Sequence, residues 1–180
     1  MEVFIGWSGP RSKIVANELK TWLKSVIQEL DPWVSFEDTD KGSQWVSQIT
    51  DTLGSCKVGI ICLTPENWQN LWVNFEAGAL AKFQEGETVV CTYLLGDLRP
   101  SDIKGPLSTF QHTLAKHEGT RRRRHDINDL LLEKKLDERL LDSTFDRWWP
   151  DLEAVVGNLP SLDEEAPPER QSDDMLREVL

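Results

Sequence analysis

The six residues Val58-Gly59-Ile60-Ile61-Cys62-Leu63 constrain the fold of this chain more than any other segment. The run is apolar at every position, so a strand formed by it must be covered on both faces. Strands of this kind are typical of parallel sheets, in which helices cover both faces. A polar turn, Thr64-Pro65-Glu66-Asn67, follows directly. The run therefore predicts a buried strand whose carboxyl end leads into a helix.

Further short apolar runs alternate with helical patterns along the chain. Strands are predicted over residues 3–7, 33–36, 58–63 and 89–95, which are rich in β-branched and aromatic side chains. Helices are predicted over about 13–30, from 43, around 72–84 and over about 125–141, where apolar residues recur every three or four positions. Strands that alternate with helices in this way indicate an α/β fold with a parallel sheet.

Length and composition fit one domain with a tail. The chain has 180 residues, of which 39% are hydrophobic and 28% charged, and these values are ordinary for a globular protein. We expect residues 1–160 to form the domain, with helices from about residue 125 capping it, and 161–180 to form an acidic, flexible tail. No apolar run approaches the roughly 18 to 20 residues of a membrane span, and no signal peptide is recognisable. A cytoplasmic protein without membrane contact is expected.

Several ligand classes are disfavoured by charge and motif content. The net charge of −11 argues against nucleic-acid binding, which needs a basic surface. The exception is Arg121-Arg122-Arg123-Arg124, which could bind a phosphate-rich ligand. Such a run is more typical of a solvated helix start or loop. The three cysteines are expected to be reduced core thiols, and no cluster has zinc-ligand spacing. Dinucleotide and phosphate-loop glycine motifs are missing. Neither a metal nor a bound cofactor is expected.

Trp72 and Glu76 are the strongest candidates for a functional site. Their Trp-x-x-x-Glu spacing places both side chains on one face of a helix, one turn apart. An aromatic ring beside a carboxylate can hold a flat cationic ring and stabilise positive charge on a sugar. The ordinary alternative is a packed tryptophan and a glutamate favoured by the helix dipole in a first turn.

Ligands in open α/β sheets bind at the carboxyl ends of the strands. Three predicted loops converge there, over residues 7–11, 37–45 and 64–76. A pocket built from these loops would contain Ser8, Arg11, Asp38, Lys41, Trp45, Trp72 and Glu76.

Three blocks of this sequence resemble the TIR (Toll/interleukin-1 receptor) domain of the bacterial type. Residues 3–9, Val-Phe-Ile-Gly-Trp-Ser-Gly, resemble the first strand of the family and the loop after it, and residues 37–45 resemble its BB loop. Residues 58–67 and 72–79 resemble the third strand and the catalytic helix. The resemblance covers roughly residues 1–150 and implies a flavodoxin-like, three-layer fold with about five parallel strands. One departure is that Arg11 follows the first strand later than the basic residue of many members.

The resemblance also implies a function. Some members only assemble, whereas others cleave the nicotinamide–ribose bond of NAD+ with the glutamate of the Trp-x-x-x-Glu motif, which is Glu76 here. The motif tryptophan matches Trp72, and Ser8 and residues 38–42 fall where the family lines its NAD pocket. With the resemblance, Glu76 is the predicted catalytic residue, and the predicted substrate-binding residues are Trp7, Ser8, Arg11, Asp38, Lys41, Gly42, Trp45 and Trp72. The leading expectation is an NAD+ nucleosidase or cyclase that uses NAD+ as substrate and makes an ADP-ribose-type signal in bacterial antiviral defence. A separate effector is expected to sense that product, and copies of the chain are expected to assemble on activation.

Two alternatives remain open at this point. The first is a non-catalytic TIR module that docks partners through the loop over residues 38–42. The second is an enzyme similar to nucleoside deoxyribosyltransferases, which would accept deoxynucleosides and ignore NAD+. Glu76→Gln separates the readings, because only an enzyme loses turnover while keeping its fold.

Overall fold

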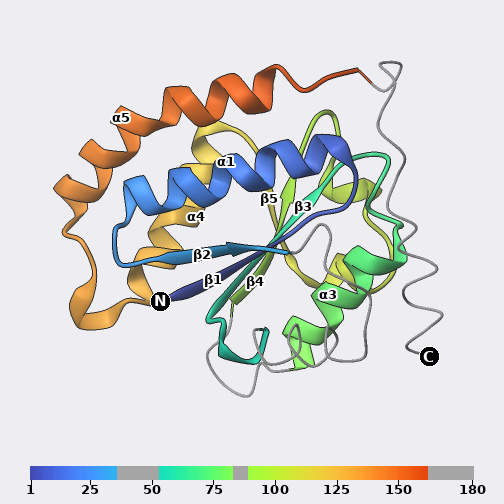
Figure 1. Cartoon of the computed structure of the whole chain (residues 1–180), viewed down its shortest axis with the longest axis horizontal. Coiled ribbons are helices and arrows are strands. Elements are labelled where there is room, and N and C mark those ends of the chain that lie inside the picture. The colour runs from blue at the N-terminus through green and yellow to red at the C-terminus, as the bar shows by residue number, and fades with distance from the viewer. Residues whose placement is uncertain (36–52, 83–88, 162–180) are drawn as a thin grey trace, which may run out of the picture.

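The computed structural model describes residues 1–35, 53–82 and 89–161 (Figure 1). Within these residues one sheet is formed by β1 (Glu2–Gly6), β2 (Asp31–Val34), β3 (Val58–Leu63), β4 (Val89–Leu94) and β5 (Gln111–Leu114). The strand order is β2-β1-β3-β4-β5, and every neighbouring pair is parallel. This is the order of flavodoxin-like sheets. The predicted α/β class with about five parallel strands is confirmed.

Helices cover both faces of the sheet, as Figure 1 shows. The described helices are α1 (Pro10–Val26), α3 (Leu71–Lys82), α4 (His117–Asp129) and α5 (Glu138–Gly157), with short 3-10 turns η1 (Pro100–Asp102), η2 (Gly105–Thr109) and η3 (Leu132–Lys134). One hydrophobic core joins Ile5, Ile60 and their neighbours to α1, α4 and α5. The second joins Phe4 and Ile61 to α3. All six residues of β3 are buried, as its unbroken apolar sequence predicts.

Two predicted boundaries near the N-terminus are wrong. The first helix begins at Pro10 and not at Lys13, because proline suits the first helical position and Gly9 precedes it with a positive φ of 84°. The second strand spans Asp31–Val34 and includes Pro32, whereas residues 33–36 were predicted. Proline is tolerated there because β2 is the edge strand among the described strands, with β1 as its neighbour.

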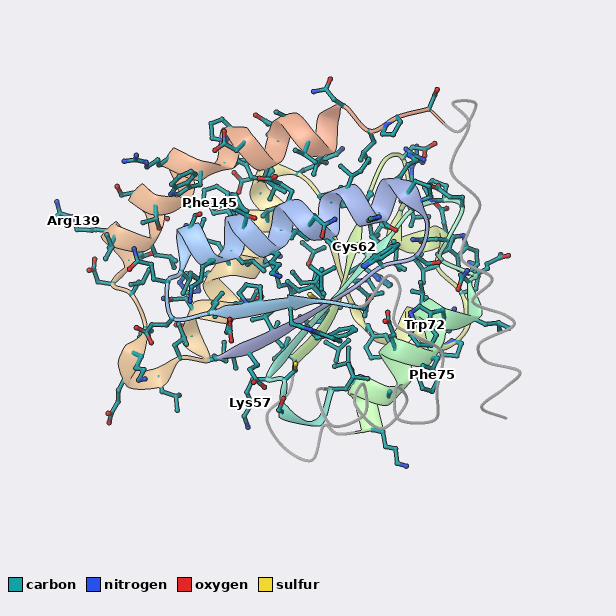
Figure 2. All side chains as sticks on the ribbon, viewed as in Figure 1. Lys57, Cys62, Trp72, Phe75, Arg139 and Phe145 are labelled. Carbon is teal, nitrogen blue, oxygen red and sulfur yellow. The ribbon has the colours of Figure 1, made fainter. Side chains whose placement is uncertain are left out.

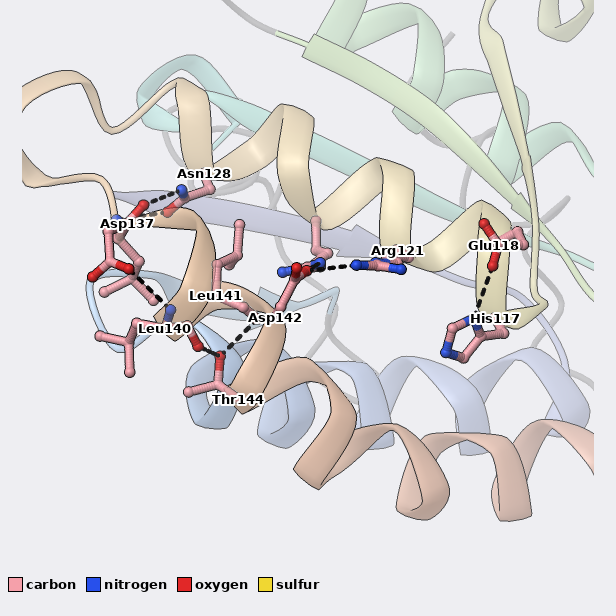
Figure 3. A network of polar contacts seen from close by, with 11 residues as sticks. His117, Glu118, Arg121, Asn128, Asp137, Leu140, Leu141, Asp142 and Thr144 are labelled. Carbon is pink, nitrogen blue, oxygen red and sulfur yellow. Dashed lines mark hydrogen bonds and ion pairs between the residues drawn. The ribbon is translucent and has the colours of Figure 1, made fainter.

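The predicted helix over about 125–141 is also wrong, since those residues span the end of one helix and the start of the next. The first, α4, ends at Asp129, and the chain then turns through Leu132, whose φ is 54°. The second, α5, begins after Asp137, whose side chain accepts a hydrogen bond from the backbone N–H of Leu140 at 3.1 Å (Figure 3). This is an ordinary N-terminal cap, and it gives α5 its own start.

The four arginines lie inside α4, neither in a loop nor at a helix start. Arg123 donates from Nε to Thr113 Oγ1 at 3.0 Å, which ties α4 to β5. Arg124 donates to Asp142 of α5, and Arg121 pairs with the same carboxylate at 3.0 Å, as Figure 3 shows for Arg121. The Arg124 guanidinium also lies 4.8 Å from the ring centre of Phe145. Arginines 121, 123 and 124 therefore serve contacts within the fold.

The pairing of α4 with α5 predicts a pH-dependent stability. Hydrogen bonds from Arg124 and then Arg121 hold the pKa of Asp142 below its ordinary value of 3.8. A carboxyl group with a lowered folded-state pKa stabilises the fold above its unfolded pKa, and that contribution is lost as the pH falls through the folded pKa. Asp142→Asn should therefore lower the free energy of unfolding at neutral pH, and the difference from the wild type should shrink below pH 3.8. Urea unfolding across this pH range measures it.

Asp129→Asn is the matched control. Asp129 is half exposed and pairs with Lys135 at 3.3 Å, and exposed pairs of this kind contribute about 0 to 1 kcal/mol. Asp129→Asn should change the free energy of unfolding little at any pH in this range. A deficit for Asp142→Asn that stays constant with pH would contradict the assigned role of the carboxylate.

Candidate functional site

Glu76 and Trp72 both lie in α3, one turn apart, as their spacing predicts. The side chain of Glu76 has an exposed fraction of 0%, and that of Trp72 only 3%. Figure 2 shows Trp72 and Phe75 together on this helix, and their ring centres are 5.5 Å apart. A Cβ atom built on Gly6, the last residue of β1, would lie 2.6 Å from Glu76 Oε2. The carboxylate therefore sits directly against the carboxyl end of β1.

The start of α3 is fixed by asparagine side chains. Asn70 accepts a hydrogen bond from the backbone N–H of Trp72 at 2.8 Å, which is the usual way an asparagine caps a helix. Asn74 donates from Nδ2 to the carbonyls of Asn70 at 2.9 Å and Trp68 at 3.2 Å. These bonds set the rotation of the first turns of α3, and with it the direction in which Trp72 and Glu76 point.

A buried asparagine joins the loops that follow β1 and β3. Asn67 Oδ1 accepts from the backbone N–H of Thr64 at 2.8 Å, and Nδ2 donates to the carbonyls of Ser8 at 2.8 Å and Cys62 at 3.2 Å. Its exposed fraction is 4%. Sequence reasoning placed Asn67 in a turn and missed this role, although asparagine is favoured in turns because its side chain bonds nearby backbone groups.

The loop after β1 folds onto the first turn of α1. The buried Ser12 hydroxyl donates to the carbonyl of Ser8 at 2.5 Å and accepts from the backbone N–H of Ser8 at 3.1 Å. Gly9 makes the turn with a φ of 84°, a conformation that other residues rarely adopt. The structure thus brings the backbone of Ser8 to the end of β3, through Asn67. Its predicted contact with substrate stays a prediction.

Arg11 bridges the ends of β3 and β4. Its Nη1 pairs with Glu66 Oε2 at 3.1 Å, and a Cβ on Gly96, which follows β4, would lie 3.3 Å from its Nη2. The guanidinium is therefore already matched with a carboxylate. A phosphate group of a substrate that reached Arg11 would compete with Glu66 for the guanidinium. The predicted contact of Arg11 with substrate stays a prediction.

Trp7 lies on the other side of the sheet from Glu76. It belongs to the core beneath α1, is 6% exposed, and donates from Nε1 to the carbonyl of Ser35 at 3.0 Å. Successive side chains of a strand point to opposite faces, so Trp7 faces α1 while the position of Gly6 faces α3. The structure does not bring Trp7 and Glu76 together. The predicted residues Asp38, Lys41, Gly42 and Trp45 lie outside the described residues.

Glu76 affects the pKa of a cysteine thiol in the neighbouring strand β3. Burial raises the pKa of the Cys62 thiol far above its ordinary value, and the nearby Cys91 and Glu76 raise it further. Burial also raises the pKa of Cys91 to about 11 and that of Cys56 to about 12. All three cysteines are buried and free of disulfides. Since the thiolate is the reactive form, these thiols are poor nucleophiles.

In the part of the chain that the structure describes, no group of three or more His, Cys, Asp and Glu side chains is placed to hold a metal ion. No helix in the same residues is both long and apolar enough to cross a membrane. The described part of the candidate site consists of the Glu76 carboxylate, the rings of Trp72 and Phe75, and the two loops that Asn67 joins by hydrogen bonds.

Comparison with known proteins identifies the family. A family model described as "TIR domain" matches residues 3–131, which run from β1 to the end of α4 and just beyond. The chain belongs to the TIR domain family. Helix α5 lies outside the matched residues and packs on α1, where Trp22 Nε1 donates to the carbonyl of Trp148 at 3.0 Å.

Two further comparisons complete this result. No curated protein matches the sequence. Among solved structures, the chain is similar to the TIR domains in the activated Roq1 resistosome that directly recognises the pathogen effector XopQ. The similarity has 12% identity and a TM-score of 0.41, and it covers 99% of this chain and 96% of that chain.

The Asn67 bridge predicts a measurable loss of stability. Asn67→Ala removes the acceptor of the Thr64 N–H and the donor to two carbonyls inside a buried edge. Leaving buried groups without partners costs roughly 1 to 3 kcal/mol, so the free energy of unfolding in urea should fall by about that amount. Asn158→Ala is the control, because its exposed side chain bonds the carbonyl of Ala154 on the outside of α5. Equal losses in the two variants would contradict the bridging role.

Proposed function

We propose that the chain is an NAD+ nucleosidase in which Glu76 is the catalytic carboxylate and Trp72 supports the substrate. The observation that carries the proposal is the position of Glu76: fully buried and held against Gly6 at the carboxyl end of β1. Ligands of open α/β sheets bind at this edge. A carboxylate in a buried position loses hydration energy, and functional sites are where proteins commonly retain such groups. Membership of the TIR family and the Trp-x-x-x-Glu spacing support the same assignment.

One carboxylate is enough for this reaction. Most glycosidases use two, because one must protonate the leaving group. Nicotinamide is cationic while it is attached to ribose and departs as a neutral molecule, so no general acid is required. The remaining demand is stabilisation of the positive charge that develops on the ribose, and a fixed carboxylate in a site that excludes water meets it. NAD+ is then the substrate, and no cofactor takes part.

The product depends on the group that attacks the ribose. Water gives ADP-ribose, whereas an adenine nitrogen or a ribose hydroxyl of the same molecule gives a cyclic isomer. We propose that the product is a signal in bacterial antiviral defence, sensed by a separate effector, and that copies of the chain assemble on activation. This part of the proposal rests on the family resemblance alone.

A second candidate function is favoured by the same burial. The exposed fractions of Glu76 and Trp72, 0% and 3%, leave no surface on Glu76 and almost none on Trp72 for a ligand in this conformation. In a non-catalytic interaction module the two side chains would serve as packing residues of α3. The two candidates differ in whether Glu76 can be changed without consequence for NAD+.

Glu76→Gln decides between them. Purified wild type should release nicotinamide from NAD+, and the variant should be at least about 10²-fold slower, since that is the usual loss when one transition-state contact is removed. Chromatography with mass spectrometry resolves nicotinamide, ADP-ribose and cyclic products. Circular dichroism should show the same fold for both proteins.

Glu118→Gln is the matched control, because its side chain is 87% exposed on α4 and carries the same chemical change. It should cleave NAD+ at the wild-type rate. Equal rates of nicotinamide release by the wild type and Glu76→Gln would contradict the catalytic role of Glu76. Release by neither, over a range of protein concentrations, would favour the interaction module, and turnover of deoxynucleosides alone would favour the deoxyribosyltransferase-like alternative.

A further inference from the structure

Gly6 occupies a position where no other residue fits without displacement of its neighbours. A Cβ there would lie 2.6 Å from Glu76 Oε2, 2.8 Å from Ile61 Cδ1 and 3.0 Å from Phe4 Cε1. Gly6 ends β1 and pairs with Ile61 in the parallel ladder, so its backbone is that of an ordinary strand. Among the glycines that the structure describes, those with positive φ are Gly9, Gly96 and Gly105, and Gly6 is not one of them. The glycine is therefore needed for space and not for backbone conformation.

A second glycine on the same face provides a comparison. Gly59 of β3 pairs with Phe4 of β1, two residues before the pairing of Ile61 with Gly6. A Cβ at Gly59 would lie 2.6 Å from Leu80 Cδ1, which is the apolar end of another α3 side chain. Both glycines thus let α3 approach the sheet closely. They differ in what they meet, since Gly59 faces a methyl group and Gly6 faces the carboxylate.

We propose that Gly6 is a positioning residue for Glu76, because its missing side chain sets the depth at which the carboxylate oxygen lies against the strand end. This inference rests on the proposed NAD+ cleavage only for its catalytic consequence. A methyl group at position 6 reaches an ordinary contact of 3.4 Å or more with Oε2 only if the carboxylate or the strand shifts. Displacement of a reacting group on the order of 1 Å can cost about 10²-fold in rate.

The catalytic consequence is tested with Gly6→Ala and Gly59→Ala, measured as kcat and KM for NAD+. Gly6→Ala should lower kcat about 10²-fold and change KM by less than about 3-fold, because the misplaced group acts on the reacting bond. Gly59→Ala imposes a clash of the same closeness on the same helix but away from the carboxylate. It should keep kcat within about 3-fold of the wild type. An unchanged kcat in Gly6→Ala, or equal losses in both variants, would overturn the proposal.

The contact itself is tested without any turnover, by a double-mutant cycle with Glu76→Ala read as thermal unfolding midpoints. Shortening Glu76 removes the atom that the new methyl group meets, so Gly6→Ala should lower the midpoint less in the Glu76→Ala background than in the wild type. Gly59→Ala should lower it equally in both backgrounds. Additive effects of Gly6→Ala and Glu76→Ala on the midpoint would contradict the proposed contact between position 6 and the Glu76 carboxylate. If the wild type releases no nicotinamide, the proposed function fails while this cycle still decides the role of Gly6.

Discussion

The candidate site depends on the close packing of α3 against the central sheet. On the other face, large side chains such as Trp22 of α1 and Phe145 of α5 fill the space between these two helices, and their ring centres lie 5.8 Å apart. On the α3 face, Gly6 and Gly59 leave room that a Cβ would fill, so the helix lies close to the strand backbones. Interiors are packed without spare volume, and a helix seated this closely can place Glu76 directly against a strand end. One face of the sheet thus carries a core of large side chains, and the other places the carboxylate of Glu76.

The carboxyl edge of the sheet is held together by side chains that cross between its loops. Asn67 joins the loops after β1 and β3, and the ion pair of Arg11 with Glu66 joins the start of α1 to the turn after β3. Ser12 closes the loop after β1 onto α1. The bonds of Asn67 and Ser12 lie in partly buried surroundings, where hydrogen bonds are stronger than in water. The loops around the site therefore depend on one another and on the strand order that brings them together.

The sequence predicts those features whose cause is local. The apolar run of β3 and the one-turn spacing of Trp72 and Glu76 follow from the periods of strands and helices, and the structure agrees with both. Prediction failed where the local sequence carries no signal. Three consecutive leucines continue the apolar pattern from α4 across Leu132, which turns the chain without a glycine or asparagine to mark the place. The roles of Gly6 and Asn67 were invisible for the same reason, because each depends on side chains or backbone brought near by the parallel sheet.

The burial of Glu76 bears on the chemistry as well as on the choice between the two candidate functions. For NAD+ cleavage the ribose must contact the carboxylate, so atoms that cover it have to move. Helix α3 is a poor candidate for that movement, because Asn70 caps its start and two glycines seat it against the sheet. The same burial therefore separates the two proposals: an interaction module can keep Glu76 covered, whereas an enzyme that cleaves NAD+ must bring the ribose into contact with it.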